Sequence, residues 1–407
     1  MPNDKVNLAP LFKMKPEEAS KYLRNKVSET SWDWHDIYER EHEKIFTVAK
    51  TAGYEVLADI RAAVQKAIDE GTTLKQFQKE LKPILEEKGW WGKITDPDNP
   101  EKEVQLGSVR RLETIYRTNL RTSYQAGRYR ELMDNVKFRP YWQYIAVLDD
   151  RTRKEHRELH GKVFRYDDPI WDTFFPPNDW GCRCTVKSLS QKDVDRLGLT
   201  VESSTGKLIT GTAELPNGKK VSGVVYRPGK GREVQTGLGW NYNPGKSWHL
   251  PITIRDPPVY HNYLKQEVKS DRFKNFLEGK SCEEKKIVGV LNSELSRIFK
   301  DITGTDTNAV LLSYDTIKSH QPDGKNHYHP EIGLKQYQKL PDIFYDPSLV
   351  QKARQEGGSF HFFFYHKEED KTYKIITKLT GDRTELYLKT IFSGKVTKNA
   401  DEIYKKD

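Results

Sequence analysis

The chain has 407 residues, and at roughly 150 residues per domain this length predicts about two or three domains and excludes a single small module. Only 35% of the residues are hydrophobic and 31% are charged, so much of the chain is expected to be surface, linker or interface. The 68 basic against 59 acidic side chains give a net charge of +9, which favours nearness to a polyanion such as nucleic acid but excludes a histone-like balance.

The start of the chain and its cysteines exclude two further classes. We find no apolar signal segment and no run of about 18 apolar residues, so we expect a soluble product of the cytoplasm with no membrane partner. Three cysteines in a chain of this length cannot form a disulfide framework. Cys182 and Cys184 are separated by one residue, which favours metal binding or plain burial over a bridge.

Residues 1–95 have helical periodicity and predict an all-helical N-terminal part. Pro16 and two following glutamates suit the first turn of a helix. Ser31 precedes a second apolar pattern, which Gly71 terminates. Thr73 is a candidate N-cap for a further helix that ends at Gly89.

A mixed module is predicted over residues 96–190, and it begins with a long helix over 107–135. Four arginines of this helix recur on one face: Arg110, Arg117, Arg121 and Arg128. Two interpretations stay open, a solvated or salt-bridged face and a contact with phosphate or an acidic partner. The apolar run 141–148 then predicts a strand.

Potential metal ligands follow that strand. If residues 153–159 are helical, His156 and His160 lie on one face, while Cys182 and Cys184 share one face of an extended segment. The four residues have the Cys₂His₂ composition of a structural zinc site, so zinc is the expected cofactor. The alternative is that these side chains are buried and hydrogen-bonded around the Pro176-Pro177 turn without a metal.

The same stretch resembles the phage Mu F-like minor head proteins, a family of phage head morphogenesis. The elements that carry the resemblance are Asp150-Arg151-Thr152-Arg153, His156, Gly161-Lys162-Val163-Phe164, Pro176-Pro177-Asn178 and Cys182-Arg183-Cys184. It extends over about residues 1–190, and residues 237–245 resemble a further family segment. Some relatives carry a cysteine pair at the positions of Arg153 and His156, which leaves the fourth metal ligand open.

The resemblance implies a minor structural protein of the virion head, made in the host cytoplasm. It implies assembly near the portal, with portal and major capsid proteins as partners. It also implies a connection with packaged DNA, in packaging or in delivery.

Residues 191–280 show no long period and predict a loop-rich connector. Within it, residues 207–210 and 220–226 flank Pro216-Asn217-Gly218 and predict a hairpin. Residues 281–407 predict a helix over 287–299, a strand over 309–312, two further helices and three closing strands. Helices followed by an antiparallel meander make an α+β domain, so the fold class expected for the chain is α+β multidomain.

The last domain contains Leu312-Ser313 with Thr316, His329-Pro330-Glu331-Ile332 and Tyr337-Gln338-Lys339-Leu340-Pro341. Through these residues it resembles, more loosely, nuclease toxins of the barnase, EndoU, colicin and RelE type that are fused to such head proteins. This resemblance implies a metal-independent ribonuclease with RNA as its substrate. His320 or His329 would act as base or acid, Lys318 or Lys378 would hold the phosphate, and Thr390 would bond it. An inert structural role is the alternative for each residue. For the chain, the alternatives are a free cytosolic ribonuclease toxin and a purely structural head protein with an inactive last domain.

Overall fold

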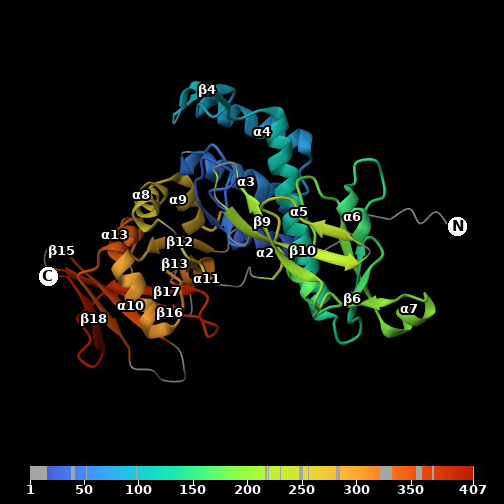
Figure 1. Ribbon diagram of the computed structural model, residues 1–407. Helices are drawn as coiled ribbons and strands as arrows, with labels where there is room; N and C mark the ends of the chain where they lie inside the picture. Colours follow the sequence, from blue (N-terminus) through green and yellow to red (C-terminus); the bar gives the residue numbers. More distant parts are fainter. Residues whose placement is uncertain are drawn as a thin grey trace. The chain divides into compact units, whose positions relative to one another are not determined.

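The computed structural model describes residues 16–37, 42–51, 53–97, 99–215, 218, 220–229, 231–246, 251–254, 256–280, 285–320, 332–353, 360–368 and 371–406. They form helices and several sheets, which confirms the α+β class (Figure 1). The chain divides into two compact units, Met1–Trp248 and His249–Asp407. Among the described residues, no helix has both the length and the apolar character needed to cross a membrane.

Four helices form the first core of the N-terminal unit. Thr73 caps α4 as predicted, because its hydroxyl accepts from the Gln76 N–H while the Gln76 side chain accepts from the Thr73 N–H. Gly71 ends α3 with a positive φ of 70°. The four helices are α2 (Pro16–Arg24), α3 (Tyr54–Glu70), α4 (Leu74–Glu87) and α5 (Val109–Asp134).

The prediction that residues 1–95 are all helical is wrong between α2 and α3 and after α4. Strand β1 (Val27–Ser28) pairs in parallel with β2 (Ile45–Phe46), and β3 (Lys93–Asp96) pairs with β4 (Asn99–Gln105). β-Branched and aromatic residues around β2 favour extended backbone, although their spacing is compatible with a helix.

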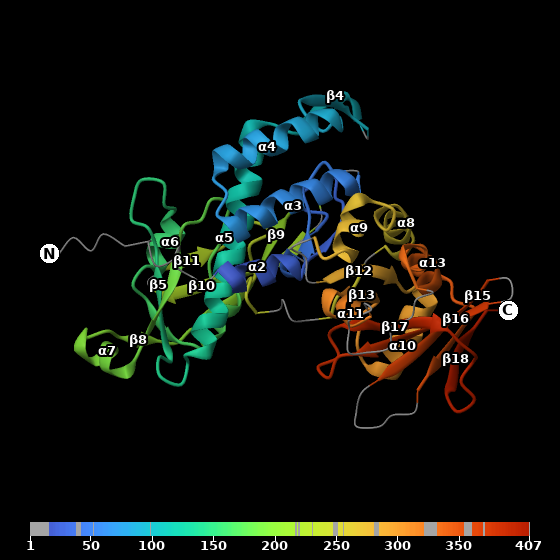
Figure 2. The same cartoon turned by 180° about the vertical axis from the view of Figure 1, so that it is seen from behind.

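A four-stranded sheet with the order β7-β5-β6-β8 follows α5. Its central strand, β5, is antiparallel to both β6 and β7, and it buries Trp142 and Tyr144 in an aromatic core with Phe164 and Trp171. Leu132 of α5 joins this core, so the long helix connects the two cores of the unit (Figures 1 and 2). The elements are β5 (Tyr141–Ile145), α6 (Lys154–Leu159), β6 (Val163–Arg165), the 3₁₀ helix η2 (Pro169–Asp172), β7 (Thr185–Leu189), α7 (Gln191–Arg196) and β8 (Val201–Glu202).

Much of the expected loop-rich connector is ordered into elements. The predicted hairpin is confirmed as β9 (Leu208–Glu214) and β10 (Lys220–Gly229), and β11 (Arg232–Gln235) extends it to three antiparallel strands. Tyr226 and Val234 enter the aromatic core around Trp142. Burial of these two side chains makes the hairpin part of the N-terminal unit.

The C-terminal unit is built on a seven-stranded sheet with the order β12-β13-β17-β16-β15-β14-β18. The three closing strands are confirmed, and β14 and β18 are additions that the sequence did not predict. Its strands are β12 (Lys285–Val290), β13 (Ala309–Ser313), β14 (Leu349–Lys352), β15 (His361–Glu368), β16 (Lys371–Leu379), β17 (Leu386–Ser393) and β18 (Asp401–Lys405). Its helices are α8 (Pro257–Glu267), α9 (Asp271–Leu277), α10 (Ser293–Thr303), α11 (Tyr314–Ser319), α12 (Leu334–Tyr337) and α13 (Leu340–Tyr345).

The helix predicted over 287–299 is a strand followed by a helix. β12 ends at Val290, and α10 starts only after Asn292, whose side chain accepts from the Leu295 N–H. Gly289 lets β12 approach α13 closely, because a Cβ there would lie 2.3 Å from Cδ2 of Phe344. The apolar period alone does not mark this break.

Helices α8 and α9 lie within the range predicted as connector, yet they belong to the C-terminal unit. Val268, Phe273 and Phe276 are part of its main apolar core, together with residues of the sheet. The two units therefore meet in the chain at residues 248 and 249, inside the expected connector.

Candidate metal centre

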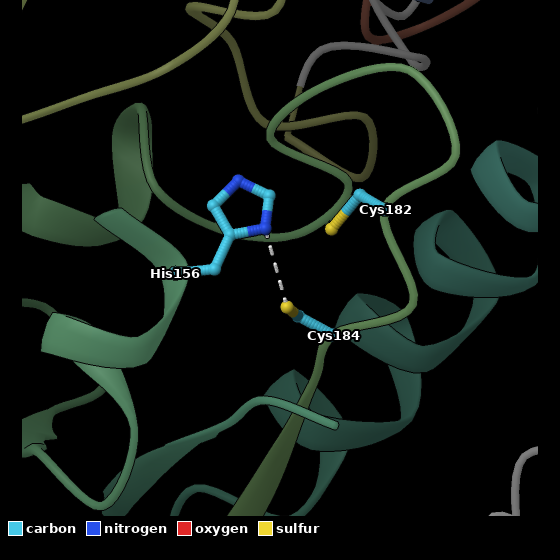
Figure 3. Close-up of side chains that lie close together, drawn as sticks. All are labelled: His156, Cys182 and Cys184. Atoms are coloured by element: carbon cyan, nitrogen blue, oxygen red, sulfur yellow. Dashed lines mark hydrogen bonds between the residues drawn. The ribbon is translucent and has the colours of Figure 1, made fainter. Parts of the chain in front are cut away.

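Three of the four predicted metal ligands converge in the N-terminal unit. One ligand atom each of His156, Cys182 and Cys184 lies within 4.8 Å of the others, and Nδ1 of His156 is 3.6 Å from Sγ of Cys184. Figure 3 shows the three side chains pointing toward one another, from α6, from the loop before β7 and from the segment entering β7. Each residue is only 4% exposed. A buried group of one imidazole and two thiols is the donor set that zinc prefers.

The predicted fourth ligand, His160, is not in this group. Helix α6 ends at Leu159, so His160 is its C-cap and has left the helical face that carries His156. Its Nδ1 accepts a hydrogen bond of 3.0 Å from the Ala146 N–H. Burial lowers the pKa of His160, which suits an imidazole that accepts at Nδ1. The structure does not place His160 beside His156, because the helix ends at Leu159, as predicted, and the backbone of His160 is no longer helical.

The two thiols have opposite electrostatic surroundings. Burial acts to raise the pKa of Cys182, but hydrogen bonds from Cys184 and His156 outweigh it, so that this pKa lies well below its ordinary value. A hydrogen bond with Cys182, together with burial, raises the pKa of Cys184. The hydrogen bond between the two thiols therefore shifts their pKa values in opposite directions.

Helix α5 holds the backbone of the cysteine segment through three side chains. Arg121 Nη1 donates to the Cys182 carbonyl at 2.9 Å, and Gln125 Nε2 donates to the Cys184 carbonyl at 3.4 Å. Arg128 Nε donates to the Val186 carbonyl at 3.3 Å. In an extended chain, every second carbonyl points to the same side. Donors that are four and then three residues apart lie on one face of a helix, so they can reach three such carbonyls in a row.

The arginines of α5 divide between the two interpretations, a surface salt bridge and a contact with another group. Arg117 forms the expected surface salt bridge, 2.7 Å from Glu113. Arg121 and Arg128, by contrast, face the interior of the unit and bind main-chain carbonyls. A sequence signal for these contacts is the spacing of Arg121, Gln125 and Arg128, which places three donors on one helical face, together with the extended segment after Cys182.

An ion pair anchors the residue between the two cysteines. The Arg183 guanidinium binds both carboxylate oxygens of Asp149, with 2.7 Å between Nη1 and Oδ2. The hydrogen bond from Arg183 holds the pKa of Asp149 well below its ordinary value. Arg153 pairs in a similar way with Asp179, at 2.8 Å. Signature residues of the sequence thus fix the loop that carries the cysteines.

Residues 237–245 pack beside that loop, although about 55 positions separate the two in the chain. The Gly237 N–H donates to the Asn178 carbonyl at 2.9 Å, and the Trp180 and Trp240 rings meet edge to face with centroids 5.2 Å apart. These side chains border a pocket of about 200 Å³, whose walls include Trp34, Leu238 and Tyr242. The two sequence segments that carry the family resemblance are therefore neighbours.

The ribonuclease candidates lie in the C-terminal unit. Lys318 is on α11 and His320 caps it, with Nδ1 of His320 bonded to the Thr316 carbonyl at 2.5 Å. Lys378 on β16 stands opposite His361 of β15. Thr390 is on β17, and its buried Oγ1 finds no hydrogen-bond partner within the described part of the chain. His329 lies outside the described residues. No hydrogen bond or ion pair among the described residues joins the other four candidates directly to one another.

Comparisons with known proteins bear on the N-terminal unit first. The family model described as "Phage Mu protein F like protein" matches residues 58–187, which include His156, Cys182 and Cys184. No solved structure matches the chain.

Two relatives extend the likeness. The "Mu-like prophage FluMu F protein" of Haemophilus influenzae is 36% identical over 372 residues, which cover 85% of this chain and 88% of that protein. The "Putative capsid assembly protein F" of Escherichia phage Mu is 43% identical over 256 residues, which cover 61% of this chain and 58% of that protein. The order of the signature elements in the sequence and the packing of the two segments agree with this similarity over nearly the full length. The chain therefore belongs to the phage Mu F-like family.

Proposed function

We propose that the protein is a minor structural component of a phage head that joins the assembly near the portal. Membership of the Mu F-like family supports a role in the head, and one relative is named for capsid assembly. The net charge of +9 supports a position close to packaged DNA. Family membership also favours this reading over a free cytosolic toxin, which has no need of an assembly module.

The observation that carries this proposal is the aromatic pocket of the N-terminal unit. Its volume of about 200 Å³ leaves room for a large side chain, and Trp34, Trp240 and Tyr242 are among its walls. Two of its residues stay open to solvent, Trp180 at 44% and Leu238 at 42% exposure. Exposed apolar side chains around a pocket are typical of a protein-binding site. The proposed occupant is an apolar segment of the portal protein.

Incorporation into heads tests this proposal. A phage that supplies Leu238→Asp in place of the native chain should yield heads that contain much less of this protein, because the pocket rim then carries a charge. Phe138→Asp is the matched control, since Phe138 is 78% exposed and does not line the pocket. The measurement is mass spectrometry of purified heads. Absence of the native chain from heads overturns the head role, and equal incorporation of both variants overturns the role of the pocket.

We also propose a ribonuclease-like effector function for the C-terminal unit. The support is the sequence resemblance of residues 281–407 to nuclease toxins. The competing proposal is an inactive structural domain of the head. Cleavage of RNA by the isolated unit, or its absence, separates the two.

A further inference from the structure

We propose that His156, Cys182 and Cys184 bind one zinc ion, with water as the fourth ligand. The inference is independent of the role in the head. It starts from the donor set, because a neutral imidazole and thiolates suit zinc, and no carboxylate of the described residues is part of this cluster. Two thiolates also balance the charge of the ion, which matters at a site where all three residues are buried.

The spacing of the donor atoms fits a tetrahedral ion. With about 2.1 Å from zinc to nitrogen and about 2.3 Å from zinc to sulfur, a tetrahedral angle separates the two atoms by roughly 3.6 Å. The His156 Nδ1 and Cys184 Sγ atoms are 3.6 Å apart, and the donor atoms of all three residues lie within 4.8 Å. Small side-chain rotations therefore suffice to bring all three to the ion.

The site is held in place by groups that do not themselves bind the metal. Arg121, Gln125 and Arg128 fix the carbonyls along the cysteine segment, and the Asp149–Arg183 pair fixes the residue between the cysteines. Such supporting contacts orient ligands before the ion arrives. An ion there would connect α6 to the segment that enters β7, and so stabilise the packing of these two elements.

The identity of the fourth zinc ligand follows from the residues around the cluster. Within the described ranges, no further histidine, cysteine or carboxylate joins these three residues. Three protein ligands and a water are a coordination that zinc adopts in proteins, and such a site exchanges its ion more readily than a closed four-ligand site. We therefore expect zinc that chelators remove and that added zinc restores.

The first test measures metal in the full-length chain, purified without chelator. Elemental analysis should find about one zinc per chain, and Co²⁺ exchanged into the site should show thiolate-to-cobalt absorption. His156→Ala and Cys184→Ser should each lower the zinc content by at least about tenfold. The matched control is His160→Gln, which can still accept the Ala146 N–H and should keep the zinc.

A second measurement needs no variant, and so it tests the proposal even if the substituted chains fold poorly. The native chain, stripped with EDTA, should gain thermal stability when zinc is added back. Of its three thiols, those of Cys182 and Cys184 should become protected from a thiol reagent. A folded native chain that takes up no zinc and keeps the Cys182 and Cys184 thiols reactive overturns the proposal in favour of a metal-free hydrogen-bonded cluster. Equal loss of zinc in folded His156→Ala and His160→Gln proteins overturns this ligand assignment.

Discussion

A buried ammonium group is the least expected single residue of the N-terminal unit. Lys26 is buried, and its Nζ donates to the His42 carbonyl at 2.5 Å and lies 4.5 Å from the centre of the Tyr22 ring. Burial lowers the pKa of Lys26 to about 7, against an attraction to Glu43 that raises it and a repulsion from Arg61 that lowers it further. Near neutral pH this side chain therefore changes charge inside the folded unit.

The consequence is a stability that rises with pH. Between about pH 7 and the ordinary lysine pKa, the unfolded chain holds a proton on Lys26 that the folded chain has released, so the free energy of unfolding increases by up to about 1.4 kcal/mol per pH unit. Lys26→Met should remove this slope. Lys66→Met is the control, because Lys66 is exposed and pairs with Glu80 on the surface.

Tryptophan fluorescence is the measurement that isolates this effect, because all nine tryptophans lie in the unit Met1–Trp248. Urea unfolding is followed at several pH values, for native chain and both variants. An unchanged slope in Lys26→Met would assign the pH dependence to other groups.

At the scale of elements, α5 organises the N-terminal unit. Its first half packs in the helical core through Leu112 and Ile115, and its last turns reach the aromatic core through Leu132. Between these contacts, Arg121, Gln125 and Arg128 donate hydrogen bonds to main-chain carbonyls of the cysteine segment. One helix thereby fixes both cores and the candidate metal centre.

Arg121→Ala should destabilise the N-terminal unit by about 1.5–3 kcal/mol, because the buried Cys182 carbonyl loses a charged donor. Arg117→Ala removes the same side chain from a half-exposed surface pair with Glu113 and should change the stability by less than about 0.5 kcal/mol. Tryptophan-monitored urea unfolding gives both values. Equal effects of the two substitutions would show that the arginines act only through the charge of the helix.

The sequence predicted elements better than contacts. The N-cap at Thr73, the length of α5 and the hairpin β9–β10 follow from local patterns, and the structure has all three. The inward direction of Arg121 depends on a segment about 60 positions away, which helical periodicity does not contain. The misplacement of His160 has the same character, since one residue at the end of α6 decides whether a side chain joins the cluster.

At the scale of the whole molecule, the C-terminal unit is larger than the expected range 281–407. Several links tie residues before 281 to it. Asn308 exchanges two side-chain hydrogen bonds with the Ile254 backbone, and Lys286 pairs with the buried Glu267 at 3.0 Å. Phe273 and Phe276 contribute to its core. A fragment cut at 281 would lose these contacts, so 249–407 is the fragment expected to fold alone.

If the C-terminal unit is a ribonuclease, fragment 249–407 should have this activity on its own. Once circular dichroism shows that it is folded, it should cleave total RNA in EDTA and leave cyclic-phosphate or 3′-phosphate ends, because a 2′-hydroxyl mechanism uses side chains and no metal. His320→Ala should lower the rate by about 10²–10⁴-fold, as expected for loss of a general acid or base, and Thr390→Val should lower it less. His366→Ala, a histidine of β15 outside the candidate set, is the control and should keep the activity. A folded fragment that cleaves no RNA would make the C-terminal unit a structural domain of the head, whereas equal losses in His320→Ala and His366→Ala would remove His320 from the catalytic assignment.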